Sequence, residues 1–206
     1  ATTDGTGEVV LFDIGAAGVG SGDITVGHAT TDKITFDGDL YKTGNALFTA
    51  KTGNTIEMNT AGITFTLSNK TLDFATGTVK LADGVNLTAG TGNGAITIHS
   101  IEGTSDETIT IDAGTSSVKI GDVGDSSHAE IHNLTISGDA GITLTGNIYT
   151  SADASSAGDV TFNDKVIIDG TVSIDTDNTG DTNATDGIIK FTTSIQSETN
   201  GTDSLT

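Results

Sequence analysis

The feature that most constrains this chain is a series of short segments in which apolar residues occupy every second position. Examples are ITFTL at 63–67, AITIHSI at 95–101 and GITLTGNI at 141–148, with threonine, histidine or asparagine among the alternate residues. A period of two places alternate side chains on opposite faces of a β-strand, so each segment is expected to bury one face. The chain is therefore predicted to be all-β.

Residues that favour turns separate these segments, and none of the chain has the apolar period of a helix. Glycine, asparagine, aspartate and serine recur between the segments, as in DGD, ADG, GNG and SGDAG, and these residues tolerate the backbone angles of tight turns. β-Branched residues dominate the segments, with 39 threonines, 21 isoleucines and 11 valines against 10 leucines. Their restricted rotamers suit a pleated surface better than a helix.

The spacing of the segments leaves three architectures open. Segments begin about every 8 to 13 residues, which suits a β-sandwich, a β-barrel or a β-solenoid. Three features favour the solenoid: GDITVGHATTDKITFDGDL resembles GDVTFNDKVIIDGTVSID in its order of turns and strands, many segments are very short, and no long crossover interrupts them. Similar short units stack so that each buries its apolar face against the next. We therefore predict a parallel β-helix with roughly 20–25 residues per turn.

The predicted solenoid is a single elongated domain, residues 1–206, whose interior holds stacked apolar side chains. Because the sequence opens and stops within its own pattern, we expect this domain to be one segment of a longer chain or filament. The residues expected to point inward are Ile34, Phe36, Ile63, Phe65, Ile96, Ile98, Ile109, Ile111, Ile142, Leu144, Val160, Phe162, Ile188 and Phe191.

Two long stretches resemble a known type of repeat. They are VNLTAGTGNGAITIHSIEGTSDETITIDAGTSSVKIGDVGD at 85–125 and IHNLTISGDAGITLTGNIYTSADASSAGDVTFNDKVIIDGTVSID at 131–175. Their phrases resemble the β-solenoid repeats of filamentous-haemagglutinin-like proteins and giant bacterial surface adhesins, well over 85–206 and loosely over 20–84. The resemblance implies a secreted, right-handed parallel β-helix in a large protein of the bacterial cell surface or of an extracellular filament.

The charge of the chain narrows its expected partners. There are 28 acidic residues against 8 basic ones, all of them lysine, for a net charge of −20. Such a chain repels nucleic acid and anionic lipid, so neither is expected as a partner. Cations, neutral glycans on a host or neighbouring cell surface, and other copies of the chain, end to end or side by side, remain. We find no apolar run near 18 residues, so no membrane insertion is expected, and the absence of cysteine excludes disulfides.

One stretch, IDTDNTGDTNATDGIIKF at 174–191, approximates a calcium-binding loop. Asp175, Asp177, Thr179 and Asp186 fall at the first, third, fifth and twelfth positions of the frame, and Gly180 falls at the sixth. Threonine at the fifth position and aspartate at the twelfth depart from the usual ligands, and strands rather than helices are expected on both sides. The alternatives are a bound calcium ion, the only cofactor that the sequence suggests, and a solvated turn.

No constellation of residues favours catalysis, so the chain is not expected to be an enzyme. It has no arginine to hold a sugar carboxylate, no tryptophan, and only two tyrosines that could stack on sugar rings. We therefore expect a non-catalytic structural or adhesive segment of a secreted protein: a stalk, fibre, sheath or surface layer. Two alternatives stay open. One is a carbohydrate-active β-helix, either a polysaccharide lyase or hydrolase or a phage-type receptor-binding fibre, and the other is a calcium-dependent binding module.

Overall fold

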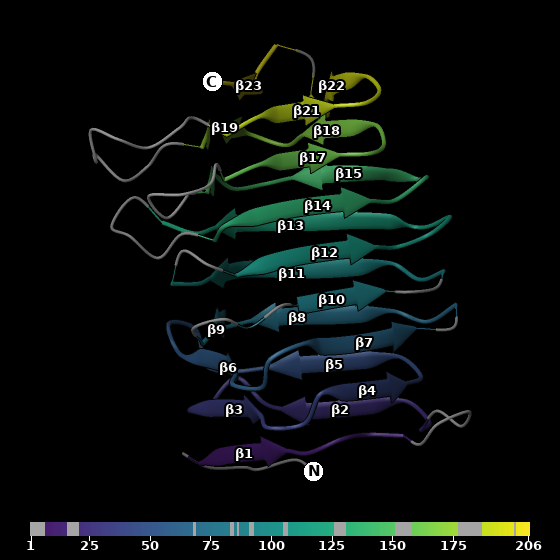
Figure 1. Ribbon diagram of the computed structural model, residues 1–206, viewed down its shortest axis with the longest axis vertical. Helices are drawn as coiled ribbons and strands as arrows, with labels where there is room; N and C mark the ends of the chain where they lie inside the picture. Colours follow the sequence, from purple (N-terminus) through teal and green to yellow (C-terminus); the bar gives the residue numbers. More distant parts are fainter. Residues whose placement is uncertain are drawn as a thin grey trace.

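A computed structural model of the chain describes residues 7–15, 21–67, 69–82, 85, 87–90, 93–104, 107–125, 131–150, 158–176, 187–199 and 201–206. The regular structure in these ranges is β-strand, and the strands pair in parallel and stack as a β-solenoid. The stack runs from the N-terminal end at the foot of Figure 1 to the C-terminal end at its top. The prediction of an all-β parallel β-helix is thus confirmed. No helix in these ranges is long and apolar enough to span a membrane.

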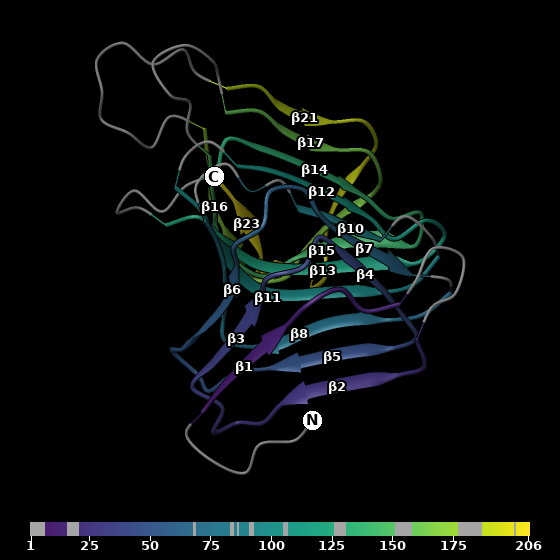
Figure 2. The same cartoon turned by 60° about the horizontal axis from the view of Figure 1, so that its bottom comes forward.

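Three stacks of strands, called walls below, surround the interior (Figure 2). The first wall is a 7-stranded sheet that faces the viewer in Figure 1. It contains β4 (Leu40–Thr43), β7 (Ile63–Leu67), β10 (Leu87–Gly90), β12 (Thr108–Asp112), β14 (Asn133–Ser137), β17 (Val160–Phe162) and β21 (Ile189–Phe191).

The second and third walls share a 14-stranded sheet. The second wall contains β2 (Ile24–Gly27), β5 (Ala46–Thr49), β8 (Leu72–Thr76), the first halves of β11 (Ile96–Glu102) and β13 (Ser117–Val123), β15 (Gly141–Leu144), β18 (Val166–Ile168) and β22 (Ile195–Ser197). The third wall contains β1 (Glu8–Leu11), β3 (Lys33–Phe36), β6 (Thr55–Met58), β9 (Thr78–Leu81), the second halves of β11 and β13, β16 (Ile148–Tyr149) and β20 (Ile174–Asp175). The short pair β19 (Thr171–Val172) and β23 (Ser204–Leu205) continues it at the C-terminal end.

A close backbone approach lets β13 turn the corner between the second and third walls. The inward alternation of Val118 and Ile120 shifts by one residue at Gly121, so that Val123 is the next inward side chain. A Cβ atom at Gly121 would lie 2.0 Å from the backbone oxygen of His99 on the turn below, which no side chain could accommodate. Glycine therefore allows one continuous strand to serve two walls at this level.

The strand register fixes the length of each turn. On the second wall Ile24 pairs with Ala46, Ala46 with Leu72, and Leu72 with Ile96. Strand partners on successive turns are separated by between 22 and 33 positions, as the pairs Ile24–Ala46 and Thr171–Ser204 show. The predicted turn of roughly 20–25 residues matches the shorter turns, and the last turn is longer.

The interior is filled by the alternate residues that the sequence pattern predicts. Twelve of the fourteen expected core residues are at most 1% exposed, which confirms the period-two assignment: Ile34, Phe36, Ile63, Phe65, Ile96, Ile98, Ile109, Ile111, Ile142, Leu144, Val160 and Phe162. Phe191 is partly buried and packs against the core.

Ile188 was assigned to the core wrongly, because its side chain is 65% exposed. The register pairs Val160 with Ile189 and Phe162 with Phe191, so the inward positions of β21 are 189 and 191. Ile188 lies one residue outside that alternation. A one-residue shift moves a side chain to the opposite face of a strand, and two adjacent isoleucines do not show which one points inward.

An aromatic cluster occupies the N-terminal half of the interior. Phe36 packs edge-on against Tyr41 and Phe48, with 4.9 Å between ring centroids in each case. Phe48 stacks on Phe74 at 5.3 Å, and Tyr41 stacks on Phe65 at 5.1 Å. The Tyr41 hydroxyl accepts a hydrogen bond from Gly38 N at 2.9 Å and donates to Leu11 O at 3.1 Å, so its polar atom is satisfied. Burial raises the pKa of Tyr41 to about 12.

Candidate functional site

The outward face of the first wall carries a column of threonines. The residue that points outward near the middle of each strand is aligned with its equivalent on the next turn. At this position β7, β12, β14 and β17 carry threonine: Thr64, Thr110, Thr135 and Thr161. The backbone of Thr88 in β10 lies in the same register, between Thr64 and Thr110. Leu40 and Lys190 occupy the same position at the two ends. The centre of this wall is therefore uncharged, although the chain has a net charge of −20.

The third wall instead carries a ladder of alternating charge at its N-terminal end. Lys33 Nζ lies 3.0 Å from Glu8 Oε1 and 3.0 Å from Glu57 Oε2, so one ammonium group bridges three turns. The hydroxyl of Thr35 and the Lys33 ammonium both donate to Glu8 and lower the pKa of its carboxyl group. The same two carboxylates raise the pKa of Lys33. In register above Glu57 come Lys80 and then Glu102.

Side chains of aspartate and asparagine connect successive turns at the corners. Asp23 Oδ1 accepts from Asn45 N at 2.8 Å, and Asn45 Oδ1 in turn accepts from Thr71 N at 3.1 Å. The hydrogen bonds from Asn45 lower the pKa of Asp23. Other corners repeat this arrangement, with Asp122 accepting from Asn147 N, Asn147 from Ser173 N, Asn133 from Asp159 N, and Asp159 from Ile188 N. We call these chains of hydrogen bonds the corner ladders.

The corner ladders were not predicted from the sequence, which assigned these residues only to turns. A signal was present: Asp23, Asn45 and Thr71 recur at separations of 22 and 26 residues, which is the length of a turn. The ladders satisfy backbone N–H groups that would otherwise lack a partner at the bends between strands.

One shallow hollow on the second wall brings two carboxylates into the same lining. It has a volume of about 280 Å³ and is lined in part by Asp23, Asn45, Thr71 and Asp73. Burial raises the pKa of Asp73, whose Oδ1 atom has no hydrogen-bond partner among the described residues, whereas the pKa of Asp23 is lowered. Environments that separate two carboxyl pKa values are a feature of acid–base catalytic pairs.

The two carboxylates of this hollow come from distant strand positions, and one of them is already hydrogen-bonded. Thr25 pairs with Leu47, and Leu47 with Asp73, so Asp23 and Asp73 are two strands and two residues apart. Their Cα atoms are therefore separated by roughly 12 Å. Asp23 already has both oxygens bonded to Asn45.

The structure describes only part of the predicted calcium loop. Asp175 lies in β20, where it pairs with Tyr149, and its backbone oxygen accepts from Thr150 N at 2.9 Å. Asp177, Thr179, Gly180 and Asp186 lie outside the described residues, so the calcium loop stays a prediction. Among the residues that the structure does describe, no group of three or more His, Cys, Asp or Glu side chains could hold a metal ion.

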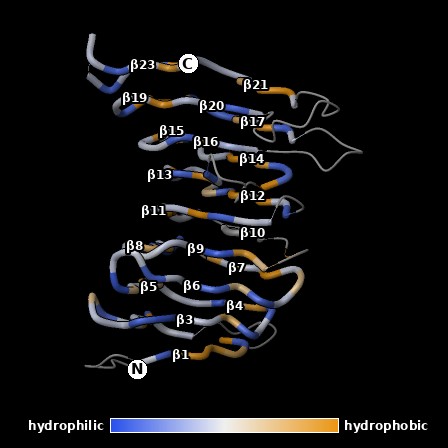
Figure 3. Tube along the Cα trace, turned by 90° about the vertical axis from the view of Figure 1, so that its left-hand side faces the viewer, coloured by the Kyte–Doolittle hydropathy of each residue, from blue (hydrophilic) through white to orange (hydrophobic). Residues whose placement is uncertain are grey.

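The two ends of the solenoid differ from its walls in exposing apolar side chains. The exposed large apolar residues in the described ranges belong to the first turn, with Val10 and Phe12, or to the last turn, with Ile188, Ile189, Ile195 and Leu205. The tube is orange at β1 and β21 in Figure 3, at opposite ends of the stack. Apolar residues at outward positions of the walls between them, such as Leu47 and Ile167, are only partly exposed.

Comparison with protein-family models, curated proteins and solved structures found no match. The fold itself defines the class of the protein as a parallel β-solenoid repeat protein.

Proposed function

We propose that this chain is a non-catalytic structural segment of a secreted bacterial surface or filament protein, in which it serves as a stiff spacer or adhesive wall. The observation that carries the proposal is the continuity of the inward columns. The column that contains Phe65, Ile111, Ile136 and Phe162 runs in register through the first wall and ends at Phe191. A solenoid whose turns bury one another in this way resists bending and gains stability turn by turn.

Features of the outer surface support a structural role. The first wall carries a column of threonines and the third wall carries paired charges, and in the hollow on the second wall Asp23 is hydrogen-bonded to Asn45. A repetitive polar surface suits repeated contacts with a neighbouring surface or glycan better than recognition of one small substrate. The alternative functions are polysaccharide cleavage and calcium-dependent binding.

A charge placed inside or outside one strand tests the structural basis of the proposal. Ile111→Asp introduces a carboxylate at a fully buried inward position, and Thr110→Asp introduces the same charge at the outward position next to it. We expect Ile111→Asp to abolish the elongated particle in small-angle X-ray scattering and to increase protease sensitivity, whereas Thr110→Asp leaves both unchanged. Equal effects of the two substitutions would show that the column is not what holds the rod together.

The absence of catalysis and the location are tested separately. Incubation with a broad panel of acidic and neutral polysaccharides should release no oligosaccharide, and release would identify a carbohydrate-active β-helix instead. Antibodies against the purified protein should label intact cells of the source organism. Labelling only after the cells are permeabilised would contradict a surface location.

A further inference from the structure

The threonine column of the first wall presents hydroxyl groups that the rest of the described chain does not occupy. Thr64, Thr110, Thr135 and Thr161 are partly exposed at one register position of β7, β12, β14 and β17. None of their hydroxyl groups has a hydrogen-bond partner among the described residues, so all four are available to a molecule that covers the wall. Because threonine is branched at Cβ, its side chain has few rotamers and holds its hydroxyl and methyl groups in nearly fixed positions.

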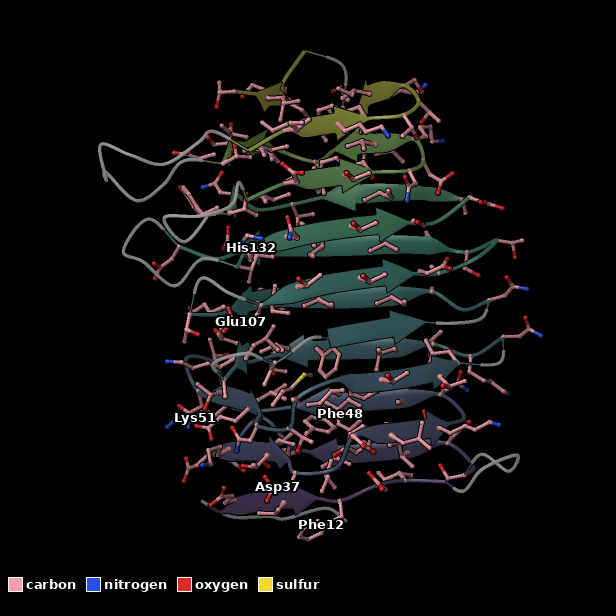
Figure 4. All side chains as sticks on the ribbon, viewed as in Figure 1. Phe12, Asp37, Phe48, Lys51, Glu107 and His132 are labelled. Carbon is pink, nitrogen blue, oxygen red and sulfur yellow. The ribbon has the colours of Figure 1, made fainter. Side chains whose placement is uncertain are left out.

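The side chains beside the column are small and almost all uncharged. On either side of it, along the same four strands, lie the outward residues Thr66, Thr108, Asp112, Asn133 and Ser137. Asp112 is the charged one, and its Oδ1 accepts a hydrogen bond from Gly114 N at 2.9 Å. Figure 4 looks onto this wall and shows short side chains over its strands, whereas Lys51 lies at the side of the stack. These four strands therefore present none of the aromatic or large apolar side chains that anchor most protein partners.

The outward columns of the other two walls are different. On the second wall the equivalent column mixes apolar, polar and charged residues from turn to turn: Thr25, Leu47, Asp73, Thr97, Lys119, Thr143 and Ile167. The third wall carries the ladder of charges around Lys33. A chain rich in threonine thus does not place threonine in register on every wall, and its repetition on the first wall requires a separate explanation.

The spacing of the threonine column is close to a repeat of the ice lattice. Parallel strands on successive turns lie about 4.8 Å apart. Water molecules in ice are bonded tetrahedrally, and with O···O distances of about 2.75 Å two oxygen atoms bonded to the same third oxygen are roughly 4.5 Å apart. With Thr110 in register with such a row, the misfit at Thr64 and Thr161, two turns away on either side, is roughly 0.6 Å. Small rotations of the side chains absorb a displacement of that size.

From these observations we infer that the first wall binds ice, with the threonine column aligned along a row of oxygen atoms in the crystal. This inference rests on the proposed adhesive wall and specifies its partner. A single hydroxyl bonded to ice gains little, because that bond replaces one to liquid water. The solenoid holds the hydroxyl groups in register before binding, so the contacts form together without a cost of ordering the protein. An uncharged surface is required, because the fixed lattice of ice cannot reorient its molecules around a charge as liquid water does.

Thermal hysteresis, the gap between the melting point of a single ice crystal and the temperature at which it resumes growth, tests the inference. Thr110→Tyr places a bulky ring at the centre of the column, and Thr143→Tyr places the same ring at a partly exposed outward position of the second wall. We expect the wild type and Thr143→Tyr to hold a crystal without growth below its melting point. Thr110→Tyr should reduce the gap to that of buffer alone, and so should Thr135→Tyr, at the same register position on the next turn. Circular dichroism and small-angle X-ray scattering that match the wild type would show that the variants are folded.

The outcomes separate the inference from its alternatives. A wild type that shows no gap, column variants that keep it, or a Thr143→Tyr variant that loses it overturns the inference. Dimerisation in sedimentation velocity, or binding to insoluble cellulose, that is lost only in the column variants and occurs without thermal hysteresis also overturns it, and assigns the wall to a second copy or to a neutral glycan. An elongated particle with no gap leaves the proposed structural function intact, whereas a compact particle contradicts both.

Discussion

Replacing Phe48 by alanine should be among the most destabilising single substitutions in the chain. Its side chain is fully buried and its ring contacts three others, Phe36 at 4.9 Å, Phe74 at 5.3 Å and Phe65 at 6.1 Å. Truncation of a buried phenylalanine to alanine costs about 3–5 kcal/mol, and each lost aromatic pair adds to the effect of area alone by about 0.5–1.5 kcal/mol. With three ring partners we expect a loss near the upper limit, about 5 kcal/mol.

Phe162→Ala is the matched control for Phe48→Ala. Phe162 is also fully buried, but its ring contact in the described residues is with Phe191 alone, at 5.0 Å, next to the exposed last turn. We expect a loss near 3 kcal/mol for this variant, the lower limit for such a truncation. The difference follows from the number of ring partners.

Hydrogen exchange and urea unfolding followed by circular dichroism measure these losses. In a solenoid, stability is a sum over neighbouring turns, so exchange in Phe48→Ala should accelerate first in β2, β5 and β8 and least in β17 and β21. Equal losses for the two variants, or uniform acceleration along the chain, would refute the argument that the aromatic cluster stabilises the N-terminal half specifically.

Three further predictions concern polar groups. Asp73→Asn should stabilise the fold by roughly 0.5 kcal/mol at pH 7, because burial raises the pKa of Asp73 and its Oδ1 lacks a partner among the described residues, while solvent around this partly exposed residue screens the charge. The native carboxyl stabilises the fold fully only below its unfolded pKa, and that contribution is lost as pH rises through the folded pKa. A gain in melting temperature at pH 7 that persists unchanged at pH 3 would contradict this. Asn45→Ala should cost about 1–2 kcal/mol in urea unfolding, because it removes the acceptor of Thr71 N and the donor to Asp23. Asn54→Ala should cost less, because it removes only one short bond, to the Asp32 backbone oxygen at 2.8 Å, and one long bond, to the Asp32 side chain at 3.4 Å. Calorimetric titration with calcium should show heat for the wild type that Asp177→Ala lacks, and equal heats, or none in either, would remove the calcium loop.

The apolar alternation made most of the fold predictable. Segments such as ITFTL and TITID place isoleucine and phenylalanine two residues apart, and the pleat of a strand then determines which side chains are buried. The core residue that was assigned wrongly, Ile188, lies where the alternation is ambiguous, because Ile189 is its neighbour. The phase of β21 is set by its pairing with Val160 on the turn below, which local sequence does not specify.

The contacts between turns could not be predicted with the same ease. Each corner ladder depends on residues between 22 and 29 positions apart, and the separation varies because the turns differ in length. Local sequence does not distinguish an aspartate that only forms a turn from one that also accepts a hydrogen bond from the next turn, since both lie beside a strand. The hollow beside Asp73 depends on the same variable spacing, which brings three strands from different turns together.

The corner ladders change how the acidity of the chain should be understood. A net charge of −20 first suggested that carboxylates select the partners of the surface. In the structure, Asp13, Asp23, Asp122 and Asp159 instead accept backbone N–H groups of the next turn, a task for which a negatively charged oxygen is well suited. Such bonds lower the pKa of Asp23, so their contribution to stability is present above its unfolded pKa and is lost as pH falls through the folded value. Part of the acidity therefore holds successive turns together, and only the remaining carboxylates are available to repel or recruit a partner.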